Sequence, residues 1–480
     1  MLDISRCSFA LRSLALFTAL LAPLGIAVAD SIELDPAFAT NGRANYSYGD
    51  YFKTLAHFRR PGGGSVGVVH YRATGNPICV AGRDCLALYP FTDAGEVQNA
   101  MAVNSGLNFS TVRGAAIDSQ GRIVVVGSVQ ISGANHDFRV IRIMPNGIPD
   151  SSFSGDGLVD IAFDVGGNDA DYANAVAIDS LDRVVVVGQV DRQTANDSDF
   201  GIVRLTSAGA LDSSFDNDGL RLIHFDLGAT LQIDSATAVA IQGGKISVGG
   251  LALDGGLGVS RIGLTRLNDN GSYDDTFCPG ACNYMGTYTA IHTGRRVIFY
   301  GNDTPALSDS ITSLAVNSAG EMITAGTTPG SGETFGYVQK FDAAGQWLAE
   351  VATQGGLPDS RVYIGGVHWS NPASTSSTVV LTGVSGPNEE FFFAQRFSSA
   401  LVPSNGWGFA GPGSSVYLST AGTGLGDVGD NRPALSSLDG GRVLIGGMYK
   451  PAALSDPYSA TIQRLRPFVS VAIFKSGFEN

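Results

Sequence analysis

Residues 149–209 read PDSSFSGDGLVDIAFDVGGNDADYANAVAIDSLDRVVVVGQVDRQTANDSDFGIVRLTSAG, and much of the remaining chain repeats this stretch. Residues 210–226, ALDSSFDNDGLRLIHFD, begin the pattern again. Self-similarity at a fixed period is typical of repeat architectures. Each unit has four short apolar segments separated by turn formers, which predicts consecutive antiparallel strands. In the first copy these are Leu158–Phe163, Ala173–Ile178, Arg183–Val190 and Phe200–Leu205.

One apolar segment with a terminal glycine marks each unit. Six clear copies end at Gly127, Gly188, Gly250, Gly326, Gly383 and Gly447, and a weaker copy spans Gly64–Arg72. The intervals between the six glycines are 61, 62, 76, 57 and 64 residues. In six units an apolar segment with an embedded base follows, the bases being Arg142, Arg204, Arg266, Lys340, Arg396 and Arg464. Seven marker segments predict seven units.

Four strands per unit and few helices favour an all-β, seven-bladed β-propeller of four-stranded antiparallel blades. A parallel β-helix is the rival, but its rungs are shorter and contain fewer hairpins. The N-terminal segment Leu34–Tyr48 has outer-strand character and no preceding unit. We expect it to complete the last unit and close the ring, with Phe468–Phe474 as the competing closing strand.

The run LDSSFDNDGLRLIHFD, followed by AVAIQGGKISVGG and GLTRLNDNG, resembles the delta-60 repeat family of bacterial secreted proteins. The LDxxF element of that family occurs at Leu34–Phe38 and Leu211–Phe215, with altered copies at Asp150–Phe153 and Asp274–Phe277. The resemblance is strongest from Phe109 to Phe277. It implies a propeller-like repeat protein without an established activity, and it supplies no catalytic residues.

The chain divides into a signal peptide at 1–29, a propeller at 30–467 and a C-terminal tail at 468–480. Arg6 and Arg12, the apolar segment Leu14–Val28 and the small residues before Asp30 are typical of a secretory signal. The tail ends in IFKSGFEN, which resembles the ends of some exported proteins of Gram-negative bacteria. We therefore expect a secreted, periplasmic or cell-surface protein of a Gram-negative bacterium.

The composition excludes some partners. The chain has 30 Lys and Arg residues against 44 Asp and Glu residues, a formal charge of −14, whereas nucleic-acid binding needs basic patches. After the signal, no apolar segment approaches the length of a membrane span. We expect a monomer without a membrane span that does not bind nucleic acid and whose candidate ligand is a protein or glycan.

Four cysteines follow the signal, and export places them in an oxidising compartment. Three pairings are possible, and the short separations favour Cys79–Cys85 and Cys278–Cys282. A zinc site is the rival, but no histidine lies beside either pair. We expect no cofactor, with calcium at Asp156, or at Asp216 and Asp218, as the competing interpretation of turn-forming residues.

The embedded bases predict structural ion pairs with a repeat carboxylate, such as the aspartate of LDxxF, more than an anion-binding ring. No catalytic motif occurs, so the sequence favours a non-enzymatic binding or structural scaffold. The alternative is an extracellular polysaccharide hydrolase or lyase whose acids come from separate blades. Two segments, Phe277–Leu307 and Ser404–Asp430, break the repeat. Their candidate ligand-loop residues are Tyr284, Tyr288, His292, Arg295, Arg296, Trp407 and Tyr417.

Overall fold

The computed structural model describes a chain built of β-strands. The described residues are 31–34, 43–46, 51–72, 85–103, 109–167, 169–192, 197–225, 227, 232–279, 294–298, 309–329, 334–353, 361–373, 377–386, 391–402, 416–419, 434–439, 442–449 and 459–468. Within these ranges there is no helix. The expected all-β class with four-stranded antiparallel sheets is confirmed.

The strands repeat in sets of four, and consecutive strands of a set pair antiparallel. The first strands are β3 (Tyr51–Arg59), β7 (Thr111–Ile117), β11 (Tyr172–Ile178), β15 (Gln232–Gln242), β19 (Ser310–Val316), β23 (Arg361–Trp369) and β27 (Ala434–Asp439). The second strands are β4 (Ser65–Arg72), β8 (Ile123–Ser132), β12 (Val184–Asp191), β16 (Lys245–Asp254), β20 (Met322–Pro329), β24 (Val379–Gly386) and β28 (Arg442–Tyr449).

The third strands are β5 (Cys85–Phe91), β9 (Asn135–Ile143), β13 (Asp197–Leu205), β17 (Val259–Leu267), β21 (Thr334–Phe341), β25 (Phe391–Phe397) and β29 (Ser459–Phe468). All of them except β5 carry an embedded base of the sequence pattern. The fourth strands, all of them short except β22, are β6 (Met101–Ala102), β10 (Leu158–Ile161), β14 (Leu220–Ile223), β18 (Arg295–Ile298), β22 (Trp347–Thr353) and β26 (Val416–Ser419). Strands β1 (Ser31–Leu34) and β2 (Arg43–Tyr46) pair with β29.

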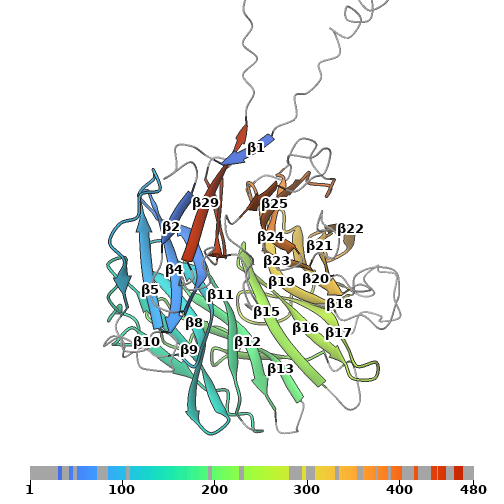
Figure 1. The fold of residues 1–480 in the computed structure, drawn as a ribbon. Helices are drawn as coiled ribbons and strands as arrows, with labels where there is room; N and C mark the ends of the chain where they lie inside the picture. The colour runs from blue at the N-terminus through green and yellow to red at the C-terminus, as the bar shows by residue number, and fades with distance from the viewer. Residues whose placement is uncertain are drawn as a thin grey trace, which may run out of the picture.

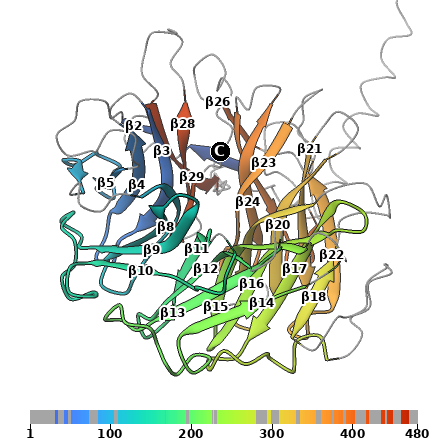
Figure 2. The ribbon, with the colours of Figure 1, turned by 90° about the horizontal axis from the view of Figure 1, so that it is seen from below.

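The sets lie side by side around a central region (Figure 2), and Figure 1 shows β1 next to β29. Each first strand contacts the first strand of the next set, and β27 contacts β3. Two pairs of sets are also joined by short parallel contacts, between β13 and β15 and between β21 and β23. We call each set a unit and name it by its strands.

A register shift interrupts the pairing between the first and second strands of the units, as between Ala173 and Ala175 of β11. Such bulges bend a strand and increase its twist. In the β11–β14 unit the residue at the bulge, Asn174, donates through Nδ2 to the carbonyl of Ala236 in the next first strand (2.9 Å). In the β15–β18 unit Thr237 likewise donates to the carbonyl of Ile311 (2.7 Å). The bulges therefore bring adjacent first strands into hydrogen-bonding contact.

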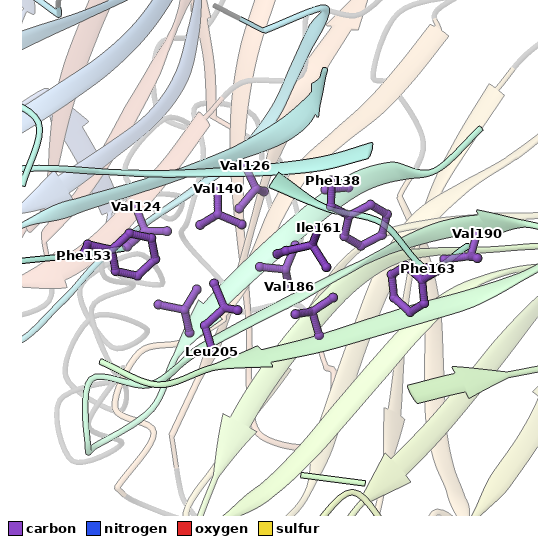
Figure 3. Packing of buried hydrophobic residues seen from close by; sticks show 13 residues of the cluster. Val124, Val126, Phe138, Val140, Phe153, Ile161, Phe163, Val186, Val190 and Leu205 are labelled. Atoms are coloured by element: carbon purple, nitrogen blue, oxygen red, sulfur yellow. The ribbon is translucent and has the colours of Figure 1, made fainter. Parts of the chain in front are cut away.

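The apolar core lies between the faces of adjacent units. Between the β7–β10 and β11–β14 units, Val126 and Phe138 pack against Val186 and Leu205 (Figure 3). The continuous apolar run Val184–Val187 supplies both faces of its sheet, because Val186 points into this cluster and Val187 into the next one. This explains why that run does not alternate with polar residues.

Candidate functional site

The most regular polar feature of the structure joins the embedded base to the aspartate of LDxxF. Among the described residues, three units contain this ion pair between buried side chains, and the sequence prediction of structural pairs is confirmed there. The pairs are Arg142–Asp150 (2.8 Å), Arg204–Asp212 (2.8 Å) and Arg266–Asp274 (2.6 Å). Each arginine also lies over the phenylalanine of its LDxxF element, namely Phe153, Phe215 and Phe277.

The same elements reach into the following unit, as the contact after β13 shows. Arg204 donates through Nη1 to the carbonyl of Asp269, in the turn after β17. The main-chain N–H of Asp216 donates to the carbonyl of Asn270 in that turn (2.9 Å). Gly271 has φ +83°, and a Cβ there would lie 2.9 Å from the Asp216 nitrogen and 3.2 Å from the Phe215 ring. Glycine is therefore needed both for its backbone conformation and for the close approach.

We call this arrangement the LDxxF contact: the base, the aspartate and phenylalanine of LDxxF, and the turn glycine of the next unit. It recurs with Phe153 against Gly209 and with Phe277 against Gly345. At the last of these positions Arg296 of β18, and not the embedded Arg266, donates to the carbonyl of Gly345. The LDxxF contact thus joins four consecutive units from β7 to β22.

Hydrogen bonding keeps the carboxylate of the contact ionised. Burial opposes ionisation of Asp274, but hydrogen bonds from the side chain and main chain of Thr276 and from Arg266 outweigh it and lower its pKa to about 2. Burial also opposes ionisation of Asp212, yet bonds from Ser214 and the charge of Arg204 lower its pKa. Both carboxylates accept hydrogen bonds from inside the protein, which suits a structural ion pair and not proton transfer.

The β19–β22 unit lacks LDxxF and uses its base differently. Lys340 pairs with Glu321 (2.8 Å) and donates to the carbonyl of Ser399, in the turn after β25 (2.9 Å). The Lys340 ammonium lies 5.4 Å from the centre of the Trp369 ring in the next unit. A base on the third strand therefore reaches the turn of the following unit even where the motif has diverged.

A buried carboxylate that the sequence analysis did not single out stands before β11. Asp171 is 2% exposed, and its oxygens accept the main-chain N–H groups of Phe163 (3.2 Å) and Asp191 (3.1 Å). Burial raises its pKa to about 7, the two N–H groups oppose this, and the charges of Asp137 and Asp169 add to it. A carboxyl with such a pKa suits general acid–base catalysis. Its burial and its two main-chain bonds keep it from a substrate.

Equivalent aspartates occur at the next two first strands, Asp234 within β15 and Asp309 just before β19. Asp234 accepts the N–H of Phe225 (2.6 Å), and the Asp309 charge contributes to the raised pKa of the fully buried Tyr337, after burial itself. The three aspartates share the pattern D-[YS]-[AI]-[NT], three residues before the strand bulge. This pattern is the sequence signal by which the three aspartates could have been found.

The structure describes three of the seven candidate ligand-loop residues. Arg295 and Arg296 lie in strand β18 and are 5% and 2% exposed, and Arg295 donates to the carbonyl of His224. Tyr417 lies in β26, where its Cα is paired with that of Phe393. The other four candidates lie outside the described residues: Tyr284, Tyr288, His292 and Trp407.

The cysteines and the acidic turns were the other candidates. Cys85 and Cys278 are buried and disulfide-bonded, while Cys79 and Cys282 lie outside the described residues, so their pairing stays a prediction. In the turns, Asp156 accepts the N–H of Leu158 (3.0 Å) and Asp218 that of Leu220 (2.9 Å). Asp216 pairs with Arg221 (3.0 Å). Among the described residues, no three acidic, histidine or cysteine side chains are grouped to hold a metal ion.

Comparison with protein families places the repeats. The β-propeller domain of unknown function DUF5122 matches residues 119–153, 182–215 and 244–277. The chain is a β-propeller repeat protein. Each matched segment begins near the hairpin between the first and second strands and ends at the phenylalanine of LDxxF, so the propeller repeat ends at the LDxxF contact.

Solved structures resemble this propeller at low identity. A protein of unknown function from Dyadobacter fermentans has 11% identity and a TM-score of 0.45, covering 90% of this chain and 100% of its own. The polysaccharide lyase Uly1 has 9% identity and a TM-score of 0.44, with coverages of 90% and 92%. An α-L-arabinanase from Penicillium chrysogenum has 8% and 0.43, with coverages of 74% and 93%. No curated protein matches the chain, and identities this low say nothing about activity.

Proposed function

We propose that this protein is an exported, seven-bladed β-propeller of the delta-60 repeat type that serves as a binding or structural scaffold for a protein or glycan ligand. Seven first strands, each beginning a four-stranded set and each contacting the next, support the blade number. The signal-like residues 1–29 support export to the periplasm, cell surface or medium.

Closure by the N-terminal strand rests on an equivalence of register. Leu205 of β13 pairs with Leu211, and Leu220 of β14 pairs with Val203. In the same way, Leu465 of β29 pairs with Leu34, and Arg43 of β2 pairs with Gln463. Leu34 is also the first residue of an LDxxF motif, as Leu211 is. The N-terminal segment thus provides the last unit with its outer strand. In the other units this strand follows the third strand in the sequence.

The observation that carries the scaffold function is the use of the repeated charges. The bases and carboxylates that recur from unit to unit hold neighbouring units together through the LDxxF contact. The pKa of Asp171, about 7, would suit acid–base catalysis, but its carboxylate is occupied by main-chain N–H groups inside the protein. Geometry that recurs from unit to unit in this way supports a rigid scaffold, whose ligand contacts come from the loops between strands.

Glycan binding and turnover distinguish this function from the polysaccharide hydrolase or lyase. We expect the chain from Asp30 to Asn480, with its disulfides intact, to bind a ligand on a glycan array or from a panel of extracellular proteins without releasing products. Reducing-end and unsaturated-sugar assays on the same polysaccharides measure turnover. Product release from any of them would contradict the scaffold function and support the enzyme.

In the absence of turnover, a matched pair of variants locates the ligand. Alanine at Trp407 changes a candidate ligand-loop residue, whereas alanine at the exposed Leu181 changes a turn of the strong repeat region. The scaffold function with variable ligand loops predicts weaker binding only for Trp407→Ala. Equal affinity of both variants would place the ligand elsewhere on the propeller.

A further inference from the structure

Asp171 stands where the chain passes from the β7–β10 unit into the β11–β14 unit. Its carboxylate joins the segment after β10, through the N–H of Phe163, to the end of β12, through the N–H of Asp191. Its own N–H donates to the carbonyl of His136 in β9 (2.7 Å). One buried residue therefore holds three segments from two units.

The segment that Asp171 holds adopts an unfavourable backbone conformation. Asp164 and Asp169 have φ of 49° and 50°, and Gly166 and Gly167 have φ of 103° and 83°. Positive φ costs free energy for residues other than glycine. A Cβ at Gly167 would lie 2.1 Å from the carbonyl oxygen of Arg192, so the segment is also pressed against the chain after β12. Such a conformation persists only while its anchors hold.

The elements around Asp171 carry several charged and titratable groups, of which Asp137 and Asp169 act on its carboxylate directly. These groups are His136, Asp137 and Arg139 of β9, Asp160 of β10, Asp164 and Asp169 of the connecting segment, Tyr172 of β11, Asp191 of β12, Arg192 after it, and Asp199 of β13. The two arginines pair with other carboxylates, Arg139 with Asp160 (2.6 Å) and Arg192 with Asp199. Burial raises the pKa of Asp137 as well, and the charges of Asp160, Asp164 and Asp169 add to the effect. The junction therefore has a negative potential.

We infer that this junction is a pH-sensitive latch, in which the segment from Phe163 to Gly167 is held against Asp171 at acidic pH and opens more often as that carboxylate ionises. Ionisation places a negative charge in a site that is buried and close to the carboxylates of Asp137 and Asp169. Opening lets water reach this charge and screen it from the charges of Asp137 and Asp169. The device adds pH dependence to a propeller whatever its ligand is.

The direction follows from linkage. The pKa of Asp171 is raised from 3.8 to about 7 in the closed junction, so this form binds the proton more tightly than an open form does. Protonation therefore favours the closed form. If opening restores the ordinary pKa, the equilibrium constant for opening rises about tenfold per pH unit between about pH 4 and 7 and is constant above that.

Amide hydrogen exchange of the chain from Asp30 measures the latch directly. After correction for intrinsic exchange rates, we expect the protection of the Phe163 and Asp191 amides to fall about tenfold per unit from pH 5 to 7 and to level off near pH 7. The Phe225 amide, bonded to Asp234 at the next junction, is the internal reference. In strand β14 of that junction, Leu222 stands at the position that Asp160 has in β10, so one carboxylate is missing. We therefore expect the protection of the Phe225 amide to change less with pH. A flat profile at Phe163 would overturn the proposal.

Two variants separate the latch from a purely structural role of the carboxylate. Asp171→Asn keeps the shape without the charge, and we expect at least tenfold greater protection of Phe163 than in the parent protein at pH 8, with no dependence on pH. In Asp169→Asn, the asparagine tolerates φ 50° and one neighbouring charge is removed. We therefore expect the protection of the Phe163 amide to level off at a lower pH. Loss of protection in a folded Asp171→Asn protein would contradict the latch. An unchanged pH profile of Phe163 protection in Asp169→Asn would also contradict the latch. This second variant tests the proposal even if Asp171→Asn misfolds.

Discussion

Replacement of Arg204 by methionine is expected to destabilise the chain from Asp30 by about 3–5 kcal/mol, the cost of breaking a buried ion pair. The Arg204 residue is 1% exposed, and its loss leaves the Asp212 carboxylate without its closest cation. The donor to the Asp269 carbonyl in the next unit is lost at the same time. The midpoint and slope of urea unfolding measure the change in the free energy of unfolding.

The matched control is the exposed pair between Arg59 and Asp93, whose side chains are 39% and 63% exposed. Arg59→Met is expected to cost about 0–1 kcal/mol, as is usual for a surface ion pair. The double variant Arg204→Met with Asp212→Leu is expected to recover part of the loss, since no buried charge then lacks a partner. Similar losses for Arg204→Met and Arg59→Met would contradict a buried LDxxF contact.

Phe215→Ala is expected to destabilise the same chain by about 3–5 kcal/mol, the usual cost of deleting a buried aromatic ring. Phe215 is fully buried, lies beneath the Arg204 guanidinium and contacts Gly271 of the next unit. Its removal leaves a cavity between two units and uncovers the ion pair. Unfolding by urea, followed by tryptophan fluorescence and circular dichroism, measures the effect.

Leu211→Ala provides the control within the same LDxxF motif. Leu211 is 44% exposed, so its truncation is expected to change the free energy of unfolding by no more than about 0.5 kcal/mol. The two apolar residues of one five-residue motif should thus differ severalfold. Equal effects would mean that the motif acts through its turn conformation and not through insertion of Phe215 between units.

The strands of the strong repeat region could be predicted because local pattern and tertiary environment agree there. The run Val184–Val187 is apolar on both faces since each face of its sheet packs against another unit. The pairing of Arg204 with Asp212 was also accessible, since a base in an apolar strand requires a buried partner. In both cases the physical requirement is visible within one repeat.

Features that depend on a neighbouring unit could not be predicted in this way. The approach of Gly271 to Phe215 joins two repeats, and nothing in either repeat alone specifies it. Arg295 and Arg296 were assigned to a loop because 18 positions separate Phe277 from β18, against 5 between Phe215 and β14. The spacing concealed a fourth strand whose place is fixed by pairing with β17. The role of Asp171 could not be predicted because its main-chain partners, Phe163 and Asp191, lie in different segments.

Disulfide trapping of the two chain ends tests the closed seven-bladed propeller most directly. Asn45 and Thr461 are Cα partners across β2 and β29, whereas Gln463 is paired with Arg43. In the chain from Asp30, oxidation of the variant Asn45→Cys, Thr461→Cys is expected to give a monomer with one new cross-linked peptide joining residues 45 and 461. The control Asn45→Cys, Gln463→Cys should cross-link far less. Failure of the first pair to link, or links formed only between differently isotope-labelled chains, would contradict closure by the N-terminal strand.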